Sequence, residues 1–166
     1  DMQLANPGYK KFRKKIPIIG TWDDHDFAFN NADGMYFFKD DSKKHFWDFL
    51  GAPKNAPIRH RYGVYQTYVF GEEDQQARII LLDMRYHMNK LSGEFLGEEQ
   101  WVWLENIFKH SKSKMHIIVS SISVLSNDSS VGEEWKDSPR EYKRLMDLIS
   151  NYKVSGPIFL TGDKHM

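Results

Sequence analysis

Short apolar runs alternate along this sequence with longer segments of helical periodicity, and that alternation restricts the fold more than any other feature. Apolar residues recur at helical spacing in 42–50, 97–110 and 139–151. A β-rich segment, 62–70, is expected to pair with the apolar run that follows it as a hairpin. The order of elements predicts an α/β fold with helices on the faces of a mixed sheet. Four apolar runs are the predicted strands: 16–21, 77–83, 116–120 and 157–161.

The ends of the early elements carry characteristic residues. Ser42 is placed to cap the first of these helices, and Gly51 follows its last turn. Pro17 stops a preceding helical segment, so 16–21 is expected to be a buried strand. A polar loop is then predicted over 23–34, where Asp and Asn are frequent.

The first and the last apolar runs each lead directly into a polar cluster. Trp22–Asp26 follows the first run, and Gly162–His165 follows the last, which is also expected to be buried. Open α/β sheets place their chemistry outside the carboxyl ends of strands, and Asp oxygen and His nitrogen bind several kinds of metal ion. If the strand continues, Asp163 and His165 point to the same side. The two clusters therefore predict half of a metal site. The alternative for each is a hydrogen-bonded loop at a strand end.

Three further groups are candidates for contact with a substrate. Arg85 follows an apolar run and suits bidentate binding of a phosphate oxygen pair; the alternative is a local ion pair with Asp83. Ser120 and Ser121 offer hydroxyl or backbone donors, or form an ordinary strand end, and no Gly-x-Ser-x-Gly elbow marks Ser121 as a nucleophile. Trp135 either covers a site or anchors a loop.

Composition narrows the classes of protein. Basic and acidic residues balance at 23 each, and the basic residues are scattered, so no nucleic-acid-binding surface is indicated. The chain has no cysteine, which excludes disulfides and thiolate metal sites within it. It has no run of roughly 18 apolar residues, so we expect no transmembrane helix. The first residue is Asp1 and the last cluster ends the chain, which favours an internal fragment of a longer protein. Oligomeric state is not indicated.

Several blocks, in order along the chain, resemble those of a known family. Trp22–Asp26 resembles the Trp-Asp-Asp-His-(Asp/Glu) block of the PhoD-like alkaline phosphatases, which belong to the metallophosphatase (calcineurin-like phosphoesterase) superfamily. Gly162–His165 resembles the Gly-Asp-Val-His block of that family. The resemblance covers essentially the whole chain, so 1–166 is expected to be part of one such domain, truncated at both ends. Further matching segments lie between the two blocks: Ser42–Gly51, Tyr62–Phe70, Leu81–Tyr86, Phe95–Trp101, Trp135 and Pro139–Glu141.

The resemblance implies a four-layer α/β/β/α sandwich and hydrolysis of phosphomonoesters or phosphodiesters by a metal-activated water. It implies a multinuclear metal centre that holds calcium and iron, with other divalent metals as further candidates. Asp24, Asp163 and His165 match metal-binding positions, and His25 matches the catalytic histidine. Arg85 is the candidate phosphate contact. Two residues are possible additions to the site: Asp23 and Asn30.

The chain also departs from the family pattern. The family's Asn-Asp pair reads Asn30-Asn31 here, and Lys164 stands where a small apolar residue is usual. The family's upstream Gly-Asp-x-x-Tyr block would precede Asp1, so we expect the isolated fragment to be inactive or nearly so. The alternative function is a catalytically degenerate scaffold or a calcium-binding interaction domain. The resemblance is compatible with a secreted, endomembrane or cell-surface location, and leaves the location unassigned.

Overall fold

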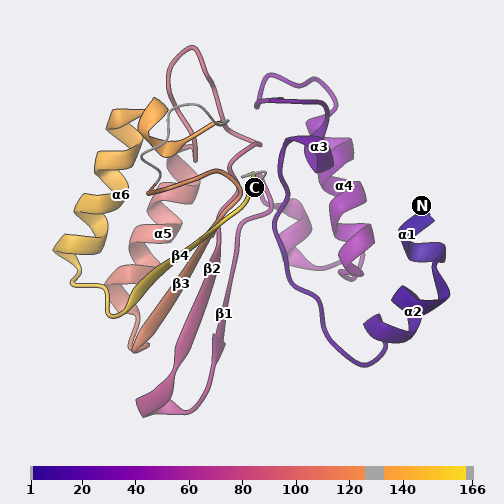
Figure 1. Cartoon of the computed structure of the whole chain (residues 1–166), viewed down its shortest axis with the longest axis horizontal. Helices are drawn as coiled ribbons and strands as arrows, with labels where there is room; N and C mark the ends of the chain where they lie inside the picture. The colour runs from indigo at the N-terminus through magenta and orange to yellow at the C-terminus, as the bar shows by residue number, and fades with distance from the viewer. Residues whose placement is uncertain (1, 126–132, 164–166) are drawn as a thin grey trace.

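Four strands form one mixed sheet in the order β1-β2-β3-β4 (Figure 1). The computed structural model describes residues 2–125 and 133–163. β1 and β2 form an antiparallel hairpin, whereas β2, β3 and β4 run parallel, so the carboxyl ends of three strands meet at one edge. This confirms the predicted hairpin and the mixed α/β sheet. The strands have these bounds: β1 Gln66–Phe70, β2 Ala77–Leu81, β3 Met115–Ser120 and β4 Pro157–Thr161.

Two long helices cover one face of the sheet (Figure 1). α5 (Glu98–His110) and α6 (Pro139–Asn151) are the crossovers between the parallel strands, and both match their predicted spans closely. Burial of each large apolar side chain stabilises the fold by about 1.5–3 kcal/mol. The larger of the two clusters of buried apolar side chains lies between these helices and the sheet. The fully buried side chains at its centre include Ile80, Ile118, Trp101, Leu104 and Leu145.

The opposite face of the sheet is more open. β4 is one of the two edge strands, and its residues Ile158 and Leu160 are 43% and 52% exposed. The prediction that this strand is buried is therefore wrong. Alternate residues of a strand face opposite sides, and Phe159 packs against the helix-covered core while its two neighbours point away from it.

The first part of the chain adds short helices and a second, smaller core beyond β1 (Figure 1). This core is largely aromatic: Trp22 packs edge-on against Phe27 and Phe46, with ring centroids 5.0 and 5.3 Å apart. No helix in the described part of the chain is both long and apolar enough to cross a membrane. The remaining elements are α1 Met2–Ala5, α2 Pro7–Arg13, α3 Asp24–Phe27, α4 Lys39–Leu50, and the 3₁₀ turns Pro57–His60, Glu73–Gln75 and Trp135–Asp137.

Residues 16–21 do not form the predicted strand. Ile16 is 48% exposed and Pro17 has no N–H to donate to a ladder. The segment is instead held by side chains: Gln66 Nε2 donates to the Gly20 carbonyl at 2.9 Å, and Thr21 Oγ1 donates to the Leu82 carbonyl at 2.7 Å. These two bonds carry the chain along the sheet to the first polar cluster without strand pairing.

Two predictions about the following segment also need correction. The polar loop 23–34 contains one helical turn, α3. Ser42 is not an N-cap, because α4 begins earlier, at Lys39, and has Asp40 and Asp41 in its first turn, where carboxylates favour a helix N-terminus. Gly51 does end α4, at φ 76°, a left-handed conformation that glycine adopts readily.

Candidate metal and phosphate site

A buried carboxylate fixes the first polar cluster to the end of β2. Asp83 is 1% exposed. Its Oδ1 accepts hydrogen bonds from Trp22 Nε1 at 2.7 Å and from the backbone N–H groups of Arg85 and Tyr86 at 2.8 and 3.0 Å. Its Oδ2 accepts from the Val64 N–H at 2.8 Å. Four donors compensate for burying this charge. The alternative considered for Arg85, a side-chain ion pair with Asp83, is replaced by a hydrogen bond from the Arg85 backbone N–H.

Asp24 begins α3 and is held as an anion. Its side chain is buried, with Oδ1 accepting the His25 N–H at 2.7 Å and Oδ2 the Asn31 N–H at 2.6 Å. Burial alone raises the pKa of a carboxyl, but these two N–H donors and the charge of Arg85 outweigh it, so the pKa of Asp24 is lowered. Asn31 reaches this position at φ 57°, a conformation that asparagine tolerates better than most residues.

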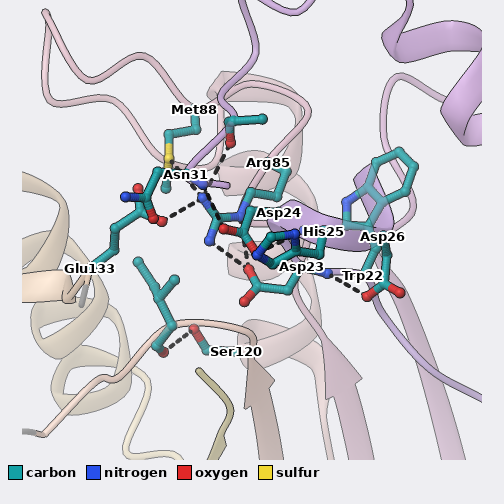
Figure 2. Close-up of polar contacts among 12 residues, drawn as sticks. Trp22, Asp23, Asp24, His25, Asp26, Asn31, Arg85, Met88, Ser120 and Glu133 are labelled. Atoms are coloured by element: carbon teal, nitrogen blue, oxygen red, sulfur yellow. Dashed lines mark hydrogen bonds and ion pairs between the residues drawn. The ribbon is translucent and has the colours of Figure 1, made fainter. Parts of the chain in front are cut away.

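Arg85 lies at the centre of a buried ion-pair network (Figure 2). Its side chain is fully buried, and Nε and Nη2 donate to Asp23 Oδ1 at 2.8 and 2.6 Å. Nη1 donates to Glu133 Oε2 at 2.6 Å and to the Ala32 carbonyl at 3.2 Å. Burial lowers the pKa of a guanidinium, but the charges of Asp23 and Glu133 raise the pKa of Arg85 above its ordinary value. Arg85 therefore ties the first cluster to the segment that precedes α6.

The last cluster approaches the first at the carboxyl edge of the sheet. Asp163 follows β4, is half-buried, and lines a pocket of about 290 Å³ together with Asp23. Burial and the charges of Asp23 and Asp24 raise the pKa of Asp163, and the charge of Arg85 only partly opposes them. Two segments from opposite ends of the sequence thus meet, and their carboxylates repel one another.

The other predicted site residues lie in different surroundings. His25 and Asn30 are both exposed at the surface, and His25 follows Asp24 in α3. Asp26 accepts the Asp23 N–H at 3.1 Å as part of the capping box that begins α3. His165 lies outside the described residues, as does Lys164, and its position relative to the pocket stays a prediction.

Trp135 anchors its loop in the core. It is fully buried, stacks edge-on against Phe95 and Trp101, and donates from Nε1 to Ser120 Oγ at 3.0 Å. Of the two interpretations of Trp135, the structure therefore supports the loop anchor. Sequence reasoning missed the role of Asp83; the available signal was a lone acidic residue directly after an apolar run.

The chemistry of the converging side chains fits a hard cation. Asp23, Asp24 and Asp163 offer carboxylate oxygens, the donors preferred by calcium, magnesium and manganese. A cation among them would relieve the repulsion seen at Asp163. Within 2–125 and 133–163, however, no three His, Cys, Asp or Glu side chains are grouped closely enough to hold an ion. The described residues by themselves therefore do not form a metal site.

The mixed sheet, its helix-covered face and the acidic residues at its strand ends define an α/β protein with a polar site at the carboxyl edge of the sheet. A family model described as PhoD-like phosphatase matches residues 1–166, and the chain belongs to that family. A solved structure described as "Structure of PhoD" superposes with a TM-score of 0.70 at 18% sequence identity, over 87% of this chain and 34% of that one. The chain thus spans about a third of the length of that protein. No curated protein matches the sequence.

Proposed function

We propose that residues 1–166 are part of one PhoD-like domain that hydrolyses phosphoric esters with the help of bound metal ions. The observation that carries this proposal is the convergence of the two polar clusters. Asp23 and Asp163 line one pocket, and the charges of Asp23 and Asp24 act on Asp163. Membership of the PhoD-like phosphatase family supports the reaction class, and phosphate esters are accordingly the proposed substrates.

Asp24, Asp163 and His165 are the proposed metal-binding residues, with Asp23 and Asn30 as further candidates. Calcium and iron are the ions that the family resemblance favours. A bound metal ion supplies charge neutralisation and a water molecule of lowered pKa. Asp24 is prepared for this role because two backbone N–H groups fix its carboxylate and keep it ionised.

His25 is the proposed proton donor to the leaving oxygen, since its exposed imidazole lies next to Asp24 in the first turn of α3. Arg85 contributes through Asp23, whose carboxylate it orients with two hydrogen bonds. Its direct contact with a phosphate stays a prediction. Its buried position favours the positioning role.

Metal binding tests this proposal most directly. Calorimetric titration of the chain with calcium or manganese should detect binding. Asp24→Asn and Asp163→Asn should each lower the affinity at least about tenfold. Asp33→Asn is the matched control, because Asp33 only accepts the Met35 N–H at 3.0 Å in an exposed turn. Absence of binding, or equal affinities for all three variants, would contradict the proposal.

Hydrolysis of p-nitrophenyl phosphate and bis-p-nitrophenyl phosphate tests the reaction class. We expect little or no turnover from residues 1–166 alone, and metal-dependent turnover from a longer chain that contains them. Asp24→Ala should abolish turnover in that longer chain. Tight calcium binding with no turnover in the longer chain would favour the scaffold alternative.

A further inference from the structure

A serine at the carboxyl end of β3 has a buried hydroxyl with no partner. Ser121 is 7% exposed, and its Oγ makes no hydrogen bond in the described part of the chain. Most buried polar side-chain atoms in folded proteins have a partner, because leaving one unpaired is costly. An orphaned hydroxyl at a pocket therefore calls for a ligand.

The hydroxyl of the preceding residue, Ser120, by contrast has hydrogen-bond partners within the protein. Ser120, labelled in Figure 2, donates from Oγ to the Ile122 carbonyl at 2.7 Å. The same oxygen accepts from Trp135 Nε1 at 3.0 Å. Those bonds satisfy it within the helix-covered core. Ser120 and Ser121 both line the pocket that Asp23 and Asp163 line, and the two serines differ in that only the Ser121 hydroxyl lacks a partner among the described residues.

The backbone fixes Ser121 relative to the end of β4. The Gly162 N–H donates to the Ser120 carbonyl at 3.2 Å. A Cβ on Gly162 would lie 3.1 Å from the Ser121 carbonyl oxygen, so glycine permits this close approach. The backbone of Ser121 is thus held against Gly162, the residue before Asp163, at the wall of the pocket.

We propose that the Ser121 hydroxyl binds substrate by donating a hydrogen bond to a phosphoryl oxygen of the ester in this pocket. The inference rests on the proposed function of the same pocket. Carboxylate oxygens such as those of Asp23 and Asp163 accept hydrogen bonds, whereas a serine hydroxyl can donate one and phosphoryl oxygens can accept it. Ser121 acts here by binding alone and forms no covalent bond.

The chain offers a matched control at the other end of the same strand. Ser113, just before β3, is 3% exposed and its Oγ is likewise buried and unpartnered. Ser121→Ala and Ser113→Ala each remove one unsatisfied hydroxyl, so neither should lower the thermal unfolding midpoint. Only Ser121→Ala should weaken binding of inorganic phosphate to the calcium-loaded chain, by about tenfold or more, measured by calorimetry.

Each result has a separate meaning. Loss of phosphate affinity in Ser121→Ala, with unchanged affinity for calcium alone and a normal Ser113→Ala, supports the inference. Equal phosphate affinity in wild type and Ser121→Ala overturns it and leaves the proposed function standing. Weaker binding of calcium alone in Ser121→Ala also overturns it, since Ser121 would then contact the ion. A wild-type chain that binds neither calcium nor phosphate overturns both proposals.

Discussion

The two acidic clusters at the carboxyl edge of the sheet differ in how the fold supports them. In the first cluster, N–H donors and a nearby guanidinium lower the pKa of Asp24. In the last cluster, burial and neighbouring carboxylates raise the pKa of Asp163. The first cluster is therefore organised by the protein itself. The last cluster is brought into position by β4, but the negative charge of Asp163 is only partly compensated, by Arg85.

The support for the first cluster comes from one short segment after β2. Asp83 receives four N–H donors, and Arg85, two residues later, orients Asp23. Both side chains are buried and both connect parts of the chain that are distant in sequence. Substitutions in this segment should therefore lower the free energy of unfolding far more than substitutions in the last cluster do.

The largest effect is expected for Asp83→Asn. The amide keeps one acceptor oxygen but turns an NH₂ group toward N–H donors that have no other partner. We expect the free energy of unfolding to fall by about 3 kcal/mol or more, measured by urea denaturation. Asp33→Asn, at an exposed turn, should change it by less than about 0.5 kcal/mol. Equal losses in both variants would show that Asp83 does not organise the first cluster.

Arg85→Lys should have an intermediate effect. Lysine keeps the charge but loses the planar fork that reaches Asp23 and Glu133 together, so a loss of about 1–3 kcal/mol is expected in the same denaturation experiment. Arg144→Lys is the matched control, because Arg144 pairs with Glu98 through two 2.8 Å bonds at the surface. That control should lose about 0.5 kcal/mol at most. A larger loss for Arg144→Lys would contradict the importance of the buried network.

The smallest expected effect is a difference between the two clusters in how folding stability depends on pH, measured in buffer that contains a metal chelator. Because the pKa of Asp163 is raised above its ordinary value of 3.8, the stability of the folded chain falls as pH rises from 3.8 through the folded-state pKa. Asp163→Asn should therefore be more stable than wild type at pH 7, by less than about 1 kcal/mol, and equal to it below pH 3.8.

Asp24→Asn should behave in the opposite way. Its lowered pKa adds stability above the ordinary value of 3.8, and that stability is lost as pH falls through the folded-state pKa. The variant should be less stable than wild type at pH 7 and converge with it in acid. Thermal unfolding across this pH range measures both differences. Shifts of the same sign for Asp24→Asn and Asp163→Asn would remove the contrast between the clusters.

Local patterns in the sequence were sufficient to predict much of the fold. α5, α6 and the β1–β2 hairpin follow from periodicity and turn residues that act within each element. The strand predicted over 16–21 failed because its residues are held by Gln66 and Thr21 side chains instead of a backbone ladder. Apolar content alone does not reveal whether a neighbouring strand is available for pairing.

The candidate site was less accessible from the sequence. Asp24 and Asp163 were identified from their clusters and the family resemblance, and their proposed roles stay predictions. The partners of Asp83 could not be predicted, because its bond to Trp22 joins residues 61 positions apart. The ion pairs of Arg85 with Asp23 and Glu133 are equally remote in sequence, so only the folded arrangement shows them.

The strand that delivers Asp163 also affects how the protein behaves at high concentration. In the described part of the chain β4 is one of the two edge strands of the sheet, next to β3, and it exposes Ile158 and Leu160. An outer strand with free backbone groups and apolar side chains is a template on which other chains can add strands and aggregate. Pro157, at the start of β4, removes one backbone donor from that template. The strand that brings Asp163 to the pocket thus also offers a surface on which the protein can self-associate.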